Sequence, residues 1–310
     1  MGTTTKMKAM EGDMTQTVET MERVQVRTGL YLLPHGDDEI FVRDGSRATF
    51  SKVIRDEDRR RLLTSIIQSA TQPVDVAELA TKLEVDEADV RTLTDRLEEE
   101  GVLERKRHLS SLQVLVIGDG QIGDSLRNIV DDMPEIQVAD SVNEVDDMAL
   151  EAAMTGMGLV IVATDSLRPH LNHEVNAAAH YLRVPVLYCY ADGPDVQVGP
   201  LVYPGETACY SCFEVQDEGA RHLRDEFLIF KDDLGHGRHT ARVSGPTAAM
   251  AAAWASLVVR DVQTRDMSRL AERVVRVETE RFEVASHRVL QMPRCPECSR
   301  VRPELQHTFL

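Results

Sequence analysis

Two pairs of cysteines, each with two residues between its members, are the clearest chemical signal in this chain. Cys209 and Cys212 form one pair, and Cys295 and Cys298 form the other. A turn with this spacing presents two thiolates to one ion, and two such turns complete the sulfur shell of a tetrahedral zinc site. Four thiolates leave no open position, so we expect structural zinc; two unconnected redox pairs are the alternative. The remaining cysteine, Cys189, lies in an apolar stretch and is predicted to be a core residue.

A glycine-rich turn is the second signal. Gly118, Gly120 and Gly123 follow a continuous apolar stretch and open a helical pattern. Glycines at this spacing allow a tight turn, close helix packing and the approach of a phosphate to the amino end of the helix. Asp140 and Asp165 follow the next two predicted strands, where α/β folds place their sites. These five residues form a candidate nucleotide site, in which Asp165 either holds Mg²⁺ or caps the helix that follows it.

The residues around this turn are strongly acidic. Between residues 112 and 208 there are fifteen Asp and Glu residues and three basic ones, Arg127, Arg168 and Arg183. Transfer of a phosphoryl or adenylyl group requires cations against the developing negative charge. We therefore expect the glycine turn to have a structural role only, without a bound nucleotide. The alternative is that it binds ATP and Mg²⁺.

The composition excludes several classes of protein. The chain has 310 residues and a net charge of −17, and only six of its 35 basic residues are lysines. Such a surface repels a phosphate backbone, which argues against a nucleic-acid partner, and it suits a halophilic cytoplasm, where salt screens self-repulsion. No apolar run is long enough for a membrane helix, and the start of the chain lacks a signal peptide. We therefore expect a cytoplasmic protein without a membrane partner.

The amino-terminal part carries the pattern of a small module. After a mobile tail predicted at residues 1–24, three short extended stretches precede three helical patterns. They span residues 29–34, 39–43, 47–53, 56–70, 75–83 and 86–100. This order predicts a winged-helix-like module over residues 25–105. Its third helix has seven acidic residues and two arginines, which disfavours DNA binding.

The rest of the chain alternates between strand and helix. A short polar segment at 106–111 is predicted to be a linker, and a second domain is predicted over residues 112–310. The predicted strands span 112–117, 136–139, 159–163, 184–190 and 274–284, and the predicted helices span 172–182 and 247–262. This alternation predicts a doubly wound α/β domain. His173 and His180 are interpreted as solvated or capping residues.

The glycine turn, Asp165 and both cysteine pairs together resemble the ubiquitin-activating-enzyme-like superfamily of ThiF, MoeB and HesA adenylating enzymes. Residues 199–212 (GPLVYPGETACYSC) and 289–298 (VLQMPRCPEC) are more narrowly similar to the ThiF-like partners of YcaO cyclodehydratases, which bind leader peptides in pathways to azoline-containing ribosomal peptides. The resemblance implies a ThiF-like α/β domain with a zinc site made of four cysteines. This chain departs from the adenylating enzymes at residues 141–147, which are acidic and lack the arginine that those enzymes direct at ATP.

The same resemblance implies a role for the amino-terminal module. In these partner proteins it is a PqqD-like peptide-recognition element of winged-helix form. A leader peptide would add as a strand along residues 47–53, against the third helix. The side chains expected to contact it are Thr49, Phe50, Val90, Leu93 and Leu97. The implied partners are a precursor peptide and a separate YcaO-type enzyme that uses ATP.

The sequence thus favours a non-catalytic peptide-binding protein. The alternative is an active ATP-dependent adenylating enzyme that acts on a peptide or carrier-protein carboxylate through the glycine turn, Asp140 and Asp165. An NAD-dependent oxidoreductase is suggested by the position of Asp140, but no catalytic His or Lys accompanies it. Because members of the superfamily often dimerise, the apolar helix at 247–262 is also a candidate homodimer interface.

Overall fold

The chain divides into two compact units, Met1–His108 and Leu109–Leu310. The computed structural model describes residues 23–47, 51–57, 61–106, 111–133, 135–142, 147–236, 241–265 and 267–300. Most of the predicted tail and of the predicted linker therefore lies outside the described residues. Arg23 and Val24, which the sequence assigns to the tail, instead begin a strand, and Val24 is fully buried.

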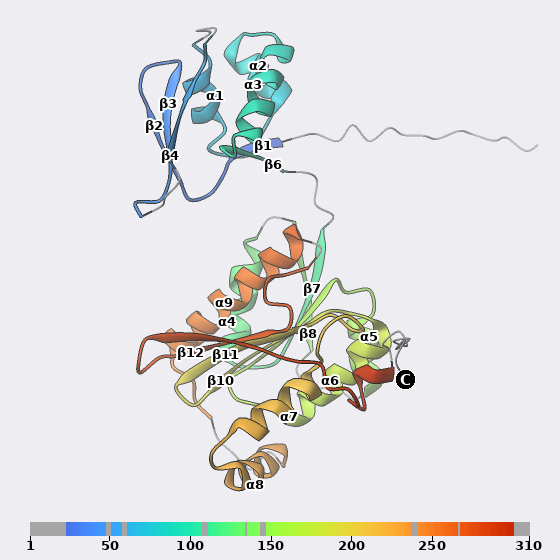
Figure 1. Ribbon diagram of the computed structural model, residues 1–310. Helices are drawn as coiled ribbons and strands as arrows, with labels where there is room; N and C mark the ends of the chain where they lie inside the picture. Colours follow the sequence, from blue (N-terminus) through green and yellow to red (C-terminus); the bar gives the residue numbers. More distant parts are fainter. Residues whose placement is uncertain are drawn as a thin grey trace, which may run out of the picture. The chain divides into compact units, whose positions relative to one another are not determined.

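The described part of the amino-terminal unit contains two antiparallel three-stranded sheets and three helices (Figure 1). One sheet has the order β5-β1-β6, and the other has the order β2-β3-β4. The strands are β1 (Arg23–Val26), β2 (Leu30–Pro34), β3 (Glu39–Asp44), β4 (Ser51–Arg55), β5 (Val74–Asp75) and β6 (Leu103–Lys106). The helices are α1 (Leu63–Ser69), α2 (Val76–Leu83) and α3 (Glu87–Glu99).

Both sheets and all three of these helices contribute to one hydrophobic core. Along β3 the buried side chains alternate, with Ile40 and Val42 facing inward, as expected of a half-buried strand. α2 and α3 begin at carboxylate caps. The side chains of Asp75 and Asp86 each accept a hydrogen bond of 2.8 Å from the backbone N–H two residues later.

Two boundaries in this unit differ from the prediction. The extended stretch expected at 47–53 is strand β4, and the helix expected from residue 56 begins only at Leu63. Arg55 pairs with Glu39 on β3, which keeps the chain extended past the predicted end of the strand. Strands β1, β5 and β6 are too short to give a sequence pattern, since each has four residues or fewer.

The carboxy-terminal unit is built on a seven-stranded mixed sheet with the order β13-β12-β11-β10-β9-β7-β8. β8, β7, β9 and β10 are parallel, and β11, β12 and β13 continue the sheet in antiparallel fashion. The strands are β7 (Leu112–Ile117), β8 (Ile136–Val142), β9 (Leu159–Thr164), β10 (Val186–Asp192), β11 (Asp195–Val202), β12 (Arg273–Glu278) and β13 (Glu283–Arg288). The four parallel strands are the first four predicted, so the α/β class is confirmed. The single strand expected at 274–284 is wrong, because a turn divides this stretch into the β12–β13 hairpin.

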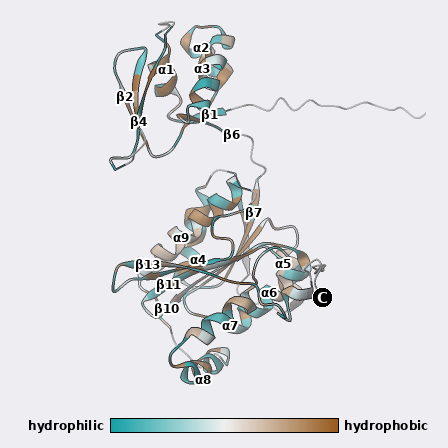
Figure 2. Ribbon diagram, in the orientation of Figure 1, coloured by the Kyte–Doolittle hydropathy of each residue, from teal (hydrophilic) through white to brown (hydrophobic). Residues whose placement is uncertain are grey.

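Helices cover both faces of this sheet (Figure 1). α4 (Gln121–Asp131) and α9 (Gly245–Thr264) pack on one face. α5 (Asp147–Met154), α6 (Pro169–Leu182) and α7 (Tyr210–Ala220) pack on the other, and α8 (Arg224–Gly235) lies against α6 and α7. The central strands are predominantly hydrophobic (Figure 2), as two buried faces require. Within the described ranges, no helix is both long enough and apolar enough to cross a bilayer.

Candidate functional site

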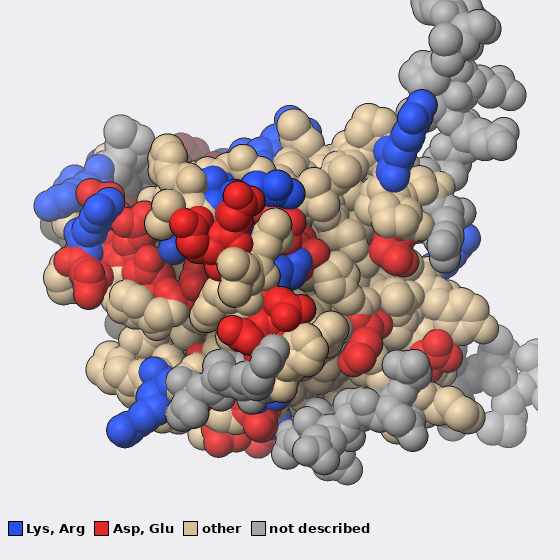
Figure 3. Space-filling model, turned by 90° about the horizontal axis from the view of Figure 1, so that it is seen from below, with Lys and Arg blue, Asp and Glu red and all other residues tan. Residues whose placement is uncertain are grey.

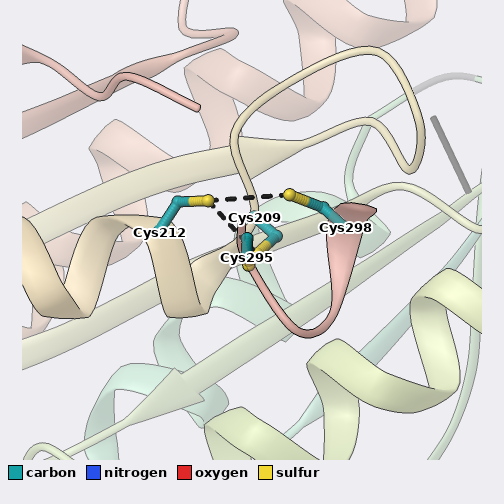
Figure 4. A group of neighbouring side chains, drawn as sticks. All are labelled: Cys209, Cys212, Cys295 and Cys298. Carbon is teal, nitrogen blue, oxygen red and sulfur yellow. Dashed lines mark hydrogen bonds between the residues drawn. The ribbon is translucent and has the colours of Figure 1, made fainter. Parts of the chain in front are cut away.

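The four cysteines predicted to bind zinc converge at one point (Figure 4). Cys209 and Cys212 come from the start of α7, and Cys295 and Cys298 come from the segment after β13. The Sγ–Sγ distances are 3.8 Å for Cys209–Cys212, 3.4 Å for Cys209–Cys295 and 3.6 Å for Cys212–Cys298. A tetrahedron with zinc–sulfur bonds of about 2.3 Å has edges of about 3.8 Å, whereas disulfide sulfurs lie about 2 Å apart. The spacing of the sulfurs therefore fits a metal ion.

The surroundings of the cluster also favour a cation. All four cysteines are at most 1% exposed. Hydrogen bonds to Cys212 and Cys298, together with burial, raise the pKa of the Cys209 thiol. Buried thiolates require a compensating cation, and the backbone N–H of Met292 already donates to Cys212 Sγ at 3.3 Å. The donor set fits structural zinc, which would supply a cross-link and leave no position for a substrate.

Cys189 lies apart from this cluster. It is 1% exposed in β10, and burial raises the pKa of its thiol to about 12. A thiol held in its neutral form is a poor nucleophile. The description of Cys189 as a core residue is therefore confirmed.

A glutamine holds the metal-binding segment to α7 as well. The side chain of Gln216 donates to the carbonyl oxygen of Leu290 at 2.7 Å and accepts from the N–H of Leu290 at 3.1 Å. It also donates to the carbonyl oxygen of Cys212 at 2.6 Å. The metal site and Gln216 therefore attach the segment after β13 to the same helix.

The glycine turn lies at the carboxyl end of β7, between β8 on one side and β9 on the other. This is the switch point at which α/β sheets bind ligands. Gly118 and Gly120 have φ values of +128° and +105°. A Cβ atom at Gly118 would lie 2.2 Å from the carbonyl oxygen of Ala163, so only glycine fits. The turn has the geometry that the sequence predicts.

Asp165, at the carboxyl end of β9, places its carboxylate on this turn. One oxygen accepts a hydrogen bond from the N–H of Gln121 at 3.0 Å, and the other accepts from the N–H of Ile122 at 2.9 Å. These are the first amides of α4, the groups that hold a phosphate in nucleotide-binding folds. A Cβ atom at Gly120 would lie 2.5 Å from the Asp165 carboxylate. The carboxylate of Asp165 therefore supplies the acceptor for the amides at the start of α4.

This contact corrects the sequence interpretation of Asp165. The expected cap on the following helix is wrong, because Arg168 is the N-cap residue of α6, it makes no side-chain cap, and Asp165 caps α4 instead. The carboxylate is directed at the amides of Gln121 and Ile122. Asp140 lies within β8, toward the carboxyl end of that strand, rather than after the strand as predicted.

Two of the three arginines in this part of the chain are engaged beside the turn. Arg168 pairs with Asp119 at 2.9 Å. Arg127 pairs with Asp124 at 2.8 Å and donates to the carbonyl oxygen of Gly118 at 2.7 Å. A carboxylate beside an arginine offsets part of the attraction that the arginine exerts on a phosphate. The local ion pairs thus reduce the cationic character of the crevice.

A row of polar residues on α6 escaped the sequence analysis. Asn172, Asn176 and His180 are at most 5% exposed, and their spacing of four residues places them on one face of the helix. The Asn176 side-chain oxygen accepts from the N–H of Tyr210 at 3.0 Å, which ties α6 to α7. Burial lowers the pKa of His180, so the interpretation of this histidine as a solvated or capping residue is wrong. The signal in the sequence was the four-residue spacing of Asn172, Asn176 and His180 next to apolar positions, which indicates one buried face of the helix.

His173 is the more exposed histidine of α6 and pairs with Glu214 of α7 at 2.7 Å. Lys231 of α8 pairs with Glu214 and Glu218, each at 2.6 Å. Burial alone would raise the pKa of Glu214, but the hydrogen bonds from His173 and Lys231 lower it. Figure 3 shows acidic side chains beside basic ones at the end of this unit that carries α8. These ion pairs hold three helices together.

The residues predicted to bind a peptide are only partly accessible. Val90 and Leu97 are buried in the core, at 0% and 2% exposure, whereas Leu93 is half-buried. Thr49 and Phe50 lie outside the described residues. The structure therefore places Leu93 and Leu97 near one another on α3. The prediction that Val90 contacts a peptide is corrected, because Val90 is a core residue.

A groove of 480 Å³ runs between β4 and α3. β4 is an edge strand, since among the described strands of its sheet it pairs only with β3. The groove is lined by Val53, Ile54, Arg55, Asp56, Glu57, Leu63, Leu93, Arg96, Leu97 and Glu100. Lys52 of β4 contacts both the carbonyl and the carboxylate of Glu100, which joins the strand to the end of α3. Residues of the edge strand β4 and of α3 thus line opposite sides of the groove.

No protein-family model matches the chain, and no curated protein matches it by sequence. Solved structures do share its fold. The heterocyclase TruD is 18% identical with a TM-score of 0.63 over 89% of this chain and 43% of that one. A heterocyclase in complex with substrate and cofactor is 16% identical, with a TM-score of 0.61 over 89% of this chain and 39% of that one.

A third similar structure is that of E. coli MccB with ATP, at 14% identity and a TM-score of 0.53 over 89% of this chain and 99% of that one. At these identities the comparisons establish a shared fold. The chain spans less than half of the two heterocyclases and almost the whole of MccB. The expected likeness to heterocyclase-related proteins is thereby confirmed at the level of the fold.

We expect the purified protein to contain one zinc ion per chain and the variant Cys298→Ser to lose it. Metal binding to structural sites contributes on the order of 10 kcal/mol to folding, so the variant should unfold at a Tm lower by about 10 °C or more. Elemental analysis and thermal unfolding measure the two effects. Cys189→Ser is the matched control and should keep its zinc; full zinc content in Cys298→Ser would disprove the assignment.

We expect Asp165→Ala to destabilise the protein by about 1–2 kcal/mol, because two amides at the start of α4 lose their acceptor. For a domain of this size the Tm should fall by about 2–8 °C. The control is Asp124→Ala, which removes an exposed carboxylate from the same helical turn and should cost less than about 1 kcal/mol. Equal Tm values for the two variants would refute the capping role.

Proposed function

We propose that this chain is a non-catalytic binding partner that captures the leader of a ribosomal precursor peptide. It would present that peptide to a separate YcaO-type enzyme, which forms azolines with ATP. The groove between β4 and α3 is the observation that carries the proposal. It combines an unpaired strand edge with leucine side chains, the two features that peptide recognition by strand addition requires.

The binding mode follows from the geometry of the groove. A peptide added to the outer edge of β4 would satisfy backbone groups that β3 leaves unpaired. Alternate side chains of that peptide would point toward Leu93, which is half-buried, whereas Leu63 and Leu97 line the groove from the core at no more than 2% exposure. Backbone pairing would supply affinity for any extended segment, and Leu93 would select an apolar residue opposite it.

The α/β unit supports a role without chemistry. Asp165 lies on the amides of α4, and Arg127 and Arg168 are each paired with an aspartate. An adenylating enzyme needs both the amides and the cations for ATP. A tethering protein needs neither, because holding the peptide near a second enzyme raises its effective concentration there.

The comparisons are consistent with this division of labour. The chain corresponds to 43% of the heterocyclase TruD and 39% of a heterocyclase determined with substrate and cofactor. The fold shared with these heterocyclases supports a role in the modification of ribosomal peptides.

We expect a leader peptide encoded near this gene to bind with micromolar or better affinity in calorimetry. Leu93→Ser should weaken binding about tenfold, because it removes an apolar contact from the groove. Leu33→Ser is the matched control: Leu33 is 52% exposed on β2, the opposite edge strand of the same sheet. No binding of any such leader, or equal losses in both variants, would count against the proposal.

The second candidate function is an ATP-dependent adenylating enzyme, favoured by the fold shared with E. coli MccB, which was determined with ATP. The two functions differ in ATP–pyrophosphate exchange. Because Asp165 covers the amides of α4, we expect no exchange above background with leader-bearing peptides. Exchange that is measurable in the wild type and absent in Asp165→Ala would establish the adenylating enzyme instead.

A further inference from the structure

A cleft of 510 Å³ lies between the carboxy-terminal half of α9 and the β12–β13 hairpin. It is remote from the glycine turn, because Gln121 at that turn contacts the carbonyl oxygen of Val243, just before the other end of α9. α9 has 20 residues and therefore extends about 30 Å. Neither the zinc site nor the glycine turn includes the residues of this cleft.

The lining of the cleft is basic although the chain as a whole has a net charge of −17. Among the described lining residues, four arginines face a single carboxylate, that of Asp261. That carboxylate is committed to the loop after α9, since it accepts from Arg265 at 2.6 Å and from the Ser268 hydroxyl and the Arg269 N–H at 2.7 Å each. The lining arginines are Arg260, Arg265, Arg269 and Arg273.

Like charges also meet on the hairpin. Arg273 of β12 lies directly opposite Arg288 of β13, on the face that carries Val275 and Ser286 toward α9. Two like charges in such a cross-strand pair are destabilising. Arg288 pairs with Glu272 at 3.1 Å, whereas Arg273 donates to the neutral hydroxyl of Ser286.

The guanidinium groups of Arg260, Arg269 and Arg273 are available to a partner. Among the residues that the structure describes, no carboxylate forms an ion pair with any of the three. The same cleft contains apolar surface, because Trp254 is part of its lining and Leu257 is 48% exposed. Arginine and tryptophan beside one another are typical of the energetically important centres of protein interfaces.

We propose that this cleft binds an acidic peptide segment of a partner protein. The carboxylates of the segment pair with Arg260, Arg269 and Arg273, and its apolar side chains pack on Trp254 and Leu257. The guanidinium groups come from a helix, a loop and a strand, so they match several carboxylates along a chain better than a single small anion. Arginine suits this role because its planar group binds a carboxylate through two hydrogen bonds. The site is independent of the groove beside β4.

Trp254 is the only tryptophan of the chain, so its fluorescence reports on this cleft in the full-length protein. The probe is a capped 12-residue peptide of four Glu-Leu-Glu repeats, and its counterpart has Gln in place of Glu. We expect a saturable change with the Glu peptide and none with the Gln peptide. Arg260→Gln and Arg269→Gln should each raise the Kd about threefold, and the double variant about tenfold. Added salt should weaken binding.

The control is Arg224→Gln, which removes an exposed arginine at the start of α8 and should leave the Kd unchanged. Equal binding of the Gln peptide, or an equal loss in Arg224→Gln, would overturn the proposal, as would no saturable change at all. Competition by free glutamate or citrate at the concentration of the peptide would show a small-anion site and likewise overturn it. Circular dichroism of each variant separates weak binding from unfolding.

Discussion

The hydrogen bonds from Gln121 and Ile122 to the Asp165 carboxylate are the interaction on which the character of the α/β unit depends. The amino end of a helix at the switch point of a parallel sheet attracts an anion in any protein of this architecture. Here the anion is the side chain of Asp165, the residue that directly follows β9. The same contact satisfies two amides that would otherwise lack acceptors and joins β7, α4 and β9 around the turn.

Three regions of the protein differ in the balance of acidic and basic side chains. At the glycine turn, Arg127 and Arg168 are each paired with an aspartate. Along β4 the surface combines a backbone edge with leucines and mixed charges. Among the described residues that line the cleft at the far end of α9, arginines outnumber carboxylates.

The features that could be predicted from the sequence are those formed by residues close together in the chain. The cysteine pairs and the glycine turn were located because each lies within a few residues, and the four parallel strands because each is a continuous apolar run. The role of Asp165 was not predictable, since it depends on β9 lying beside β7. His180 was misread because α7 and the metal-binding segment cover a helix face that the sequence alone leaves open. The arginine cleft was not predictable, because it brings together α9, a loop and a hairpin that are separate in the sequence. The PqqD-like character of the first unit stays a prediction.

The sequence separation of the metal ligands has a consequence for the order of events during synthesis. Cys209 precedes Cys295 by 86 residues, and α8, α9, β12 and β13 lie between the two pairs. The ribosome must therefore produce all of these elements before the first two sulfurs can share an ion with the second two. The groove beside β4, in contrast, is made wholly of residues that precede Gly101. A nascent chain thus contains every residue of this groove long before it contains Cys295 and Cys298.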